Sequence, residues 1–175
     1  MINPALRLPV RALGVLTAAL LAIDAYVHLH DAGLYDGGTG ITEGALFRVQ
    51  ACVAVVVALA LLVRPQRAVW VIALLVAAGA AGAIYLYTYV DVGALGPLPN
   101  MYEPTWALPD KRLAAAAETA ATATAALGLA APVLARLHGR TPRTRHYTRD
   151  SRVRRGAGRR NADSARSSMR GEGAQ

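Results

Sequence analysis

The sequence predicts an all-α, polytopic membrane protein: four antiparallel transmembrane helices followed by a disordered, basic C-terminal tail. Two observations predict this class. The chain of 175 residues is 54% hydrophobic and has a mean hydropathy of +0.31, yet its pI is near 10.4. Apolar spans beside a separate basic region explain this combination. The single cysteine, Cys52, excludes an intramolecular disulfide and any metal or redox motif built from several cysteines.

Four segments are long and apolar enough to cross a bilayer. A hydrocarbon core about 30 Å thick needs about 20 mainly apolar helical residues. The first segment also resembles a signal peptide, but Asp24 and Tyr26 interrupt the positions that a cleavage site would need, so we expect an uncleaved span. The predicted four-helix domain covers residues 1–135, and its spans are residues 12–30, 45–63, 68–90 and 113–135.

Small residues in the last two spans predict close helix packing. The third span contains "AAGAAGAIY", in which Ala78 and Gly82, and Gly79 and Ala83, have small-xxx-small spacing. The fourth span consists mostly of Ala and Thr, which gain little from contact with lipid. We therefore expect the fourth span to pack against its neighbours.

The distribution of charge predicts the orientation of the spans. Arginines precede the first span, fill the "RPQR" turn between the second and third, and dominate the segment after the fourth. The other two connections are acidic. By the positive-inside rule, both termini lie in the cytoplasm and both acidic loops lie outside the cell membrane. The charges that count are Arg7, Arg11, Arg64 and Arg67 on one side, and Asp31, Asp36, Glu43, Asp91, Glu103 and Asp110 on the other.

The tail, residues 136–175, contains twelve arginines, three acids and almost no large apolar residues. It cannot bury a core, so we expect it to be disordered. Its charge favours binding to anionic lipid headgroups at the cytoplasmic surface of the bilayer. Nucleic acid is a less favoured partner, because bases stack on aromatic rings and Tyr147 is the only aromatic residue in the tail.

Polar side chains lie inside all four spans at a similar depth. Asp24 and His28 share one helical face, one turn apart. Arg48, Tyr85 and Glu118 each lie about 9–10 Å inside the outer end of their spans. Ionisable residues within spans usually face the bundle interior as pairs, so we expect Arg48 between the carboxylates of Asp24 and Glu118. The predicted cluster consists of Asp24, His28, Arg48, Tyr85, Tyr89 and Glu118.

Two roles for this cluster stay open. It is either a buried ion pair that fixes helix register, or a site that binds a proton, a cation or a small ligand from outside. The favoured function is a non-enzymatic bundle or accessory subunit. The alternative is a membrane redox or metal-dependent enzyme subunit that uses Asp24, His28 and Glu118, which are also the candidate metal ligands. The sequence names no cofactor, and it fits a partner subunit and a homo-oligomer equally.

The connection before the fourth span, "DVGALGPLPNMYEPTWALPDKR", contains four prolines that interrupt regular structure. Tyr102 and Trp106 supply aromatic anchors at the level of the lipid headgroups. This loop is predicted either to cap the outer mouth of the bundle or to belong to an ordinary interfacial belt.

The string "YVDVGALGPLPNMYEPTW", after an acidic, His-bearing first span, resembles small four-span membrane proteins of actinobacteria over about residues 13–135. In size and span count the chain also resembles the DoxX-type proteins, whose sequence motifs it does not match. The resemblance implies a four-span membrane protein and assigns no activity or functional residue.

Overall fold

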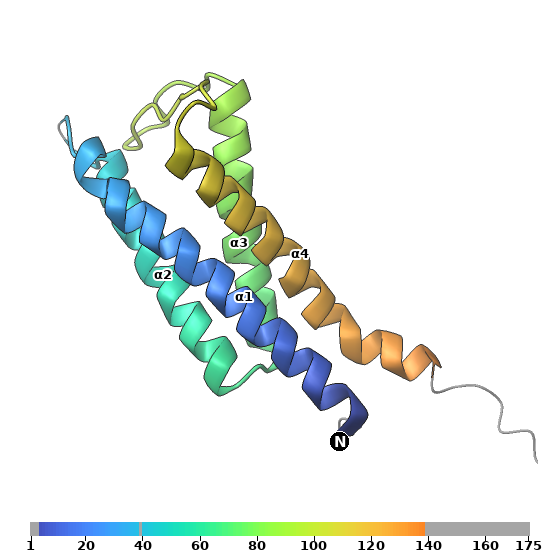
Figure 1. Ribbon diagram of the computed structural model, residues 1–175. Coiled ribbons are helices and arrows are strands. Elements are labelled where there is room, and N and C mark those ends of the chain that lie inside the picture. Colours follow the sequence, from blue (N-terminus) through green and yellow to red (C-terminus); the bar gives the residue numbers. More distant parts are fainter. Residues whose placement is uncertain (1–3, 39, 139–175) are drawn as a thin grey trace, which may run out of the picture. The chain divides into compact units, whose positions relative to one another are not determined.

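The described part of the chain, residues 4–38 and 40–138 of the computed structural model, contains four long α-helices and no β-strand (Figure 1). All four are long and apolar enough to cross a membrane, so the predicted all-α, four-span class is confirmed. The first three residues of the predicted tail, residues 136–138, are helical, and the rest of it, from residue 139, lies outside the described residues. The helices are α1 (Pro4–Asp31), α2 (Glu43–Val63), α3 (Arg67–Tyr89) and α4 (Pro109–His138), and a short 3-10 helix, η1 (Ala32–Tyr35), follows α1.

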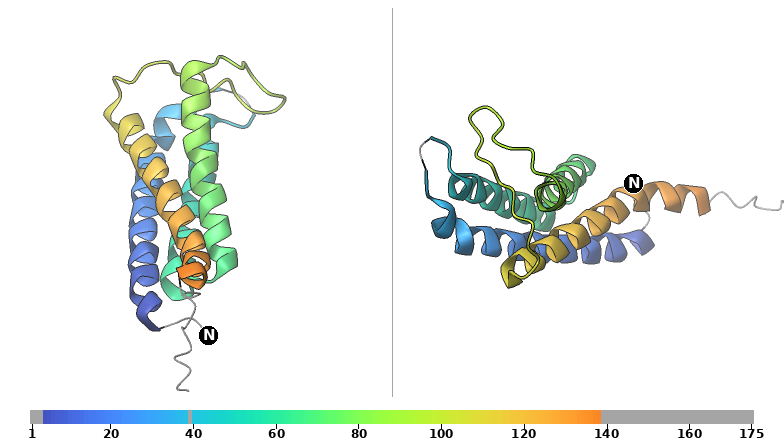
Figure 2. Two further views of the ribbon diagram at one scale, coloured as in Figure 1. Left: turned by 90° about the vertical axis from the view of Figure 1, so that its right-hand side faces the viewer. Right: turned by 90° about the horizontal axis from the view of Figure 1, so that it is seen from above.

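The helices run alternately up and down (Figure 1). α1 packs against α2 and α4, and α3 packs against α4, whereas α2 and α3 touch over a shorter stretch. A short turn joins α2 to α3, and the two helices diverge toward the other end of the bundle (Figure 1). That other end carries η1 and the long connection of residues 90–108, and we call it the loop end (Figure 2).

Small side chains fill the core. Alanines of all four helices are almost fully buried there, and small residues let helix axes approach closely. On α3 the packing face consists of Ala73, Ala77 and Ala81, one turn apart. It does not include the expected glycines, because a Cβ added at Gly79 or Gly82 meets no neighbour within 4 Å. Large apolar side chains point outward instead, as a lipid-facing surface requires.

One glycine does lie at a close contact. Trp70, near the start of α3, is 3% exposed and its ring lies directly against Gly128 of α4. A Cβ added at Gly128 would collide with that ring. Gly128 therefore sets the distance between α3 and α4 at the end opposite the loop end.

Candidate functional site

The inward face of α1 carries a mixed stripe. Thr17, Leu21, Asp24 and His28 follow one another at spacings of four, three and four residues, which places them on one helical face. All four are buried. Asp24 thus belongs to the core-facing stripe of an apolar helix, which explains why this acid lies within the span and not after it.

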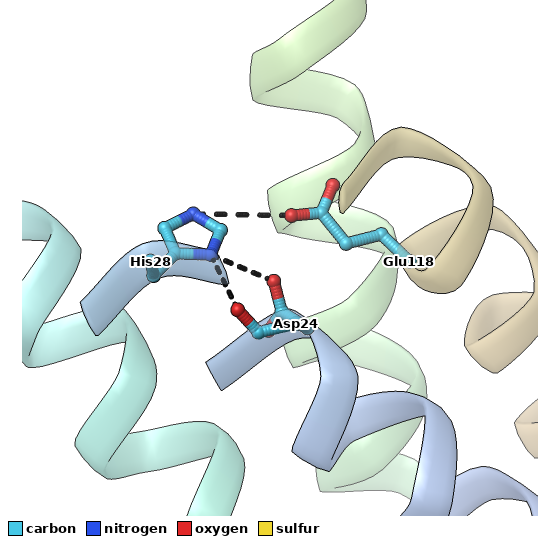
Figure 3. A group of neighbouring side chains, drawn as sticks. All are labelled: Asp24, His28 and Glu118. Atoms are coloured by element: carbon cyan, nitrogen blue, oxygen red, sulfur yellow. Dashed lines mark hydrogen bonds and ion pairs between the residues drawn. The ribbon is translucent and has the colours of Figure 1, made fainter. Parts of the chain in front are cut away.

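α4 brings a second carboxylate to this stripe. Asp24 and Glu118 are both 0% exposed and His28 is 9% exposed. Each ring nitrogen of the imidazole faces one of the two carboxylates (Figure 3). Its Nδ1 lies 2.9 Å from Asp24 Oδ1 and 3.0 Å from the Asp24 backbone carbonyl oxygen. Its Nε2 faces Glu118 Oε1 at 3.9 Å, which is longer than a hydrogen bond. We call these three residues the buried triad.

The two carboxylates of the triad differ in their hydrogen bonding. Gln50 of α2 donates from Nε2 to Asp24 Oδ2 at 3.2 Å, whereas Asp24 Oδ1 has no hydrogen-bond partner among the described residues. Neither oxygen of Glu118 has a hydrogen-bond partner within the described part of the chain. Buried polar atoms are nearly always hydrogen-bonded, so a carboxylate with two free oxygens is an exception that needs an explanation.

The expected position of Arg48 between Asp24 and Glu118 is wrong. Its guanidinium donates two hydrogen bonds to Asp36, from Nη1 to Oδ1 at 2.7 Å and from Nη2 to Oδ2 at 2.6 Å. Both side chains are nearly half exposed. A long arginine side chain reaches out of the membrane interior toward the polar interface, and the connection after η1 provides an acid there. The guanidinium holds the pKa of the Asp36 carboxyl below its usual range.

Close packing at the start of α2 keeps Asp36 within reach of Arg48. A Cβ added at Gly44 would collide with the Ala32 carbonyl oxygen and the Asp36 side chain. Thr42 caps α2 by accepting a hydrogen bond from Ala45 N at 3.1 Å, and its hydroxyl also lies 3.4 Å from Asp36 Oδ1. Asp36 therefore interacts with α2 twice, through its cap and through Arg48.

Tyr85 and Tyr89 also lie away from the triad, contrary to expectation. The Tyr85 hydroxyl lies 3.2 Å from Thr119 Oγ1, and the Tyr89 hydroxyl accepts a hydrogen bond from Trp106 Nε1 at 3.3 Å. Both tyrosine rings lie beside the Trp106 ring, and both side chains are exposed. They anchor the long connection on the outside of the bundle and do not complete the polar cluster.

A cavity of about 310 Å³ lies between the diverging halves of α2 and α3 at the loop end. Its walls are mostly apolar and come from all four helices. His28 and Gln50 lie at its inner end, so the imidazole has the cavity on one side and the buried carboxylates on the other. Ligand sites typically combine apolar walls with a few placed polar groups, and this volume is at the lower end of their range of about 300–1,000 Å³.

The long connection covers this cavity, which supports the cap interpretation. Met101, Glu103 and Leu108 line the cavity, whereas the predicted cap residues Tyr102 and Trp106 do not. Glu103 N donates to the Tyr87 carbonyl oxygen at 3.0 Å. The connection is thereby tied to α3 beside the cavity.

Acidic groups outnumber basic ones around the cavity. Apart from His28, Lys111 is the one basic residue in its lining. The Lys111 ammonium group donates to the Glu103 carbonyl oxygen and lies 5.0 Å from the centre of the Trp106 ring. A cleft with one sign of charge and apolar walls concentrates ions of the opposite sign. Asp31, Glu43 and Glu103 line the cavity, and Asp24 and Glu118 lie directly behind His28.

The structure thus brings together three of the six predicted cluster residues, Asp24, His28 and Glu118, and adds one that the prediction missed. Gln50 is the only Asn or Gln within the four predicted spans, and that isolated amide was the available signal. Comparison with family models, curated proteins and solved structures gives no match. The chemistry of the site is therefore argued from its own geometry.

Proposed function

We propose that the protein is a non-enzymatic, multi-pass protein of the cell membrane that binds a small positively charged solute from the outer side. The solute enters the capped cavity and is held at the buried triad. Glu118 is the observation that carries this proposal: its carboxylate is fully buried, and neither oxygen has a hydrogen-bond partner among the described residues. An unpaired carboxylate at this depth is costly unless it takes up a proton or a cation accompanies it.

A purely structural role for the triad fits less well. In a structural ion pair, a protonated His28 would compensate Glu118. Its Nε2, however, lies 3.9 Å from Glu118 Oε1, which is longer than a hydrogen bond, and Arg48 binds Asp36 instead. A second polar contact between α1 and α4 shows how a purely structural contact looks in this protein. Thr17 Oγ1 and Thr124 Oγ1 lie 2.9 Å apart, and each also lies within hydrogen-bond distance of a carbonyl oxygen in its own helix. That contact is satisfied without any ligand, and the contact at Glu118 is not.

The orientation follows from the charges. The connections at the loop end are mostly acidic, and Arg11, Arg64 and Arg67 lie at the opposite end, so the loop end faces outside and both termini face the cytoplasm. The basic tail then binds anionic headgroups of the inner leaflet. A cysteine placed at Asn100 in a Cys52→Ser background should react with a membrane-impermeant thiol reagent in intact cells, and one placed at Gln66 should not. The reverse labelling pattern would contradict this orientation.

A metal-dependent enzyme subunit is the second candidate function. It is favoured by one observation: the cavity lies directly beside His28, so a small substrate in it would adjoin an ion bound at the triad. Binding of a cation with no associated turnover supports the first candidate.

Thermal unfolding in one mild detergent tests the proposal. The wild-type chain and Glu118→Gln are each titrated with Na⁺, K⁺, Mg²⁺, Ca²⁺, Mn²⁺, Zn²⁺ and methylammonium. At least one of these cations should raise the unfolding midpoint of the wild type in a saturable way and leave Glu118→Gln unchanged. Asp91→Asn is the matched control, because it removes one acid from the loop end that does not line the cavity. Equal shifts in wild type and Glu118→Gln, or no shift with any cation, would contradict the proposal.

A further inference from the structure

We infer that the buried triad is a binding site for a divalent transition-metal ion such as Zn²⁺, with His28 Nε2 and the Glu118 carboxylate as ligands and Asp24 as the residue that orients His28. This inference rests on the proposed function and names the class of solute. Ligand atoms of the three residues all lie within 4.8 Å of one another. They come from α1 and α4, which pack closely together, so the site does not depend on a mobile loop.

The protonation pattern of His28 points its free lone pair at Glu118. The atoms next to Nδ1 are the Asp24 carbonyl oxygen, which only accepts hydrogen bonds, and an Asp24 carboxylate oxygen. Nδ1 therefore carries the hydrogen of a neutral imidazole, and Nε2 carries the lone pair. A histidine whose other nitrogen donates to a carbonyl or carboxylate is the usual arrangement behind a metal-ligating imidazole.

The gap between His28 and Glu118 has the size that an ion needs. Nε2 and Oε1 are 3.9 Å apart, whereas a direct hydrogen bond would be about 2.7–3.2 Å long. Zinc binds imidazole nitrogen at about 2.0–2.1 Å and carboxylate oxygen at about 2.0–2.2 Å, so an ion fits between these two atoms. A small rotation of the Glu118 side chain would bring the angle at the ion toward tetrahedral. Without an ion, the lone pair of Nε2 faces the unpartnered oxygens of Glu118 (Figure 3).

Charge and ligand type select the class of ion. The carboxylates of Asp24 and Glu118 carry two negative charges when ionised, and a divalent ion with a neutral imidazole brings the buried group to zero. A monovalent ion would leave one negative charge uncompensated in the membrane interior. An imidazole ligand favours zinc and its transition-metal neighbours, whereas Mg²⁺ and Ca²⁺ prefer oxygen ligands throughout.

The cavity supplies a route to His28, and the small number of protein ligands leaves coordination positions free. It reaches His28 from the loop end, and Asp31 and Glu103 on its walls attract cations. Only two residues of the triad provide ligand atoms in this arrangement, so the ion keeps open positions for water or for another ligand. Open positions of this kind distinguish an exchangeable or reactive zinc site from a closed structural one.

Zinc binding to the full chain tests the inference. The protein is purified in mild detergent, stripped with a chelator and titrated with Zn²⁺ and, separately, with Mg²⁺. The wild type should bind one Zn²⁺ at the triad, and Glu118→Gln should lose that site. His30→Gln is the matched control, because His30 lies on the same helix, is exposed, stacks on Tyr26 at 5.8 Å, and belongs to a separate group with the half-buried Asp31 and Asp110. Loss of Zn²⁺ in His30→Gln, or retention in Glu118→Gln, would overturn the assignment.

The role of Asp24 has its own readout. Asp24→Asn should keep one ion per chain but weaken its affinity by about 10–100-fold, as loss of an orienting carboxylate does elsewhere. With Co²⁺ in place of Zn²⁺, the same variant should shift the visible absorption bands of the bound ion, which a merely structural role would leave unchanged. Unaltered affinity and spectrum would remove Asp24 from the site.

A measurement on the wild type alone guards against variants that fail to fold. X-ray absorption by the Zn²⁺-loaded chain should show a shell of nitrogen and oxygen ligands with the scattering pattern of one imidazole. A shell without imidazole would overturn the inference. If Na⁺ or methylammonium stabilises the protein through Glu118 and Zn²⁺ does not bind, the proposed function stands and the metal site falls. If no cation binds, both fall.

Discussion

Arg48 donates two hydrogen bonds to Asp36 at 2.7 and 2.6 Å, at the loop end of the bundle. This pairing removes from the interior the arginine that lies within the outer half of α2. The buried carboxylates of Asp24 and Glu118 consequently have an imidazole and an amide as neighbours, but no arginine or lysine within salt-bridge distance in the described ranges. The buried triad therefore lacks a guanidinium because Arg48 pairs with Asp36 at the surface.

The first prediction is that Arg48 and Asp24 act independently. Arg48→Gln should lower the unfolding midpoint only slightly, because its partner is exposed and the pair is screened by solvent. The effects of Arg48→Gln and Asp24→Asn should add in the double variant, since the two residues share no partner. Thermal unfolding of the two single variants and the double variant in one detergent measures this. A double variant markedly more stable than the sum predicts would indicate that Arg48 contacts the triad.

The second prediction concerns the pH dependence of the Asp36–Arg48 pair. The guanidinium lowers the pKa of Asp36 in the folded protein. A lowered folded-state pKa means that the stabilisation is fully present above the unfolded-state value, which is about 3.9 for aspartate, and is lost as the pH falls through the lower folded-state value. The difference in unfolding midpoint between wild type and Asp36→Asn should thus be constant near pH 6 and shrink below about pH 4. A difference that stays constant down to pH 3 would refute the assignment.

Helical periodicity explains which parts of this site could be predicted. Asp24 and His28 are four residues apart in an apolar run, so their shared face follows from the sequence alone. Counting residues along its span also predicts the depth of Glu118. The same count gives Arg48 the same depth. Depth along the helix axis, however, does not determine which way a side chain faces or how far a long side chain extends.

The remaining errors have related causes. Gln50 is two positions from Arg48, which corresponds to about 200° around a helix, so the amide faces inward when the guanidinium faces out. Asp36 lies near α2 because the chain packs closely against Gly44. A periodic sequence pattern does not predict such a contact. Depth along α3 alone also suggests that Tyr85 and Tyr89 belong to the polar cluster. Their rings instead lie beside Trp106, which is in an irregular connection whose path helical periodicity does not predict.

The third prediction tests the contact between α3 and α4. Gly128→Ala places a methyl group where the Trp70 ring lies, so the helices must shift or the ring must turn. Overpacking of this kind typically costs about 1–3 kcal/mol. Gly82→Ala is the matched control, since its added Cβ meets no atom within 4 Å, and it should be neutral or slightly stabilising. Chemical unfolding in detergent compares the two. Equal behaviour of the two variants would mean that Trp70 does not pack on Gly128.

The last prediction separates a binding site from a structural ion pair at Glu118. If Glu118 served only to hold α1 and α4 together as an ion pair with a protonated His28, Glu118→Gln would leave the His28 charge uncompensated. The free energy of unfolding would then fall by about 3–5 kcal/mol. In chelator-treated protein we expect instead that Glu118→Gln unfolds at a midpoint no lower than that of the wild type. Without a cation, the Glu118 oxygens have no hydrogen-bond partner in the described part of the chain, whereas the amide of Glu118→Gln can donate to His28 Nε2.

Glu118→Gln should accordingly be at least as stable as the wild type when metal is absent. Added Zn²⁺ should reverse this order, because the ion binds the folded wild type and raises its midpoint by mass action, and the variant lacks the carboxylate ligand. Unfolding of both proteins with chelator and with Zn²⁺, in the same detergent, provides the four midpoints required. A variant that is strongly destabilised under both conditions would favour the structural ion pair, because the loss would then be independent of any bound ion.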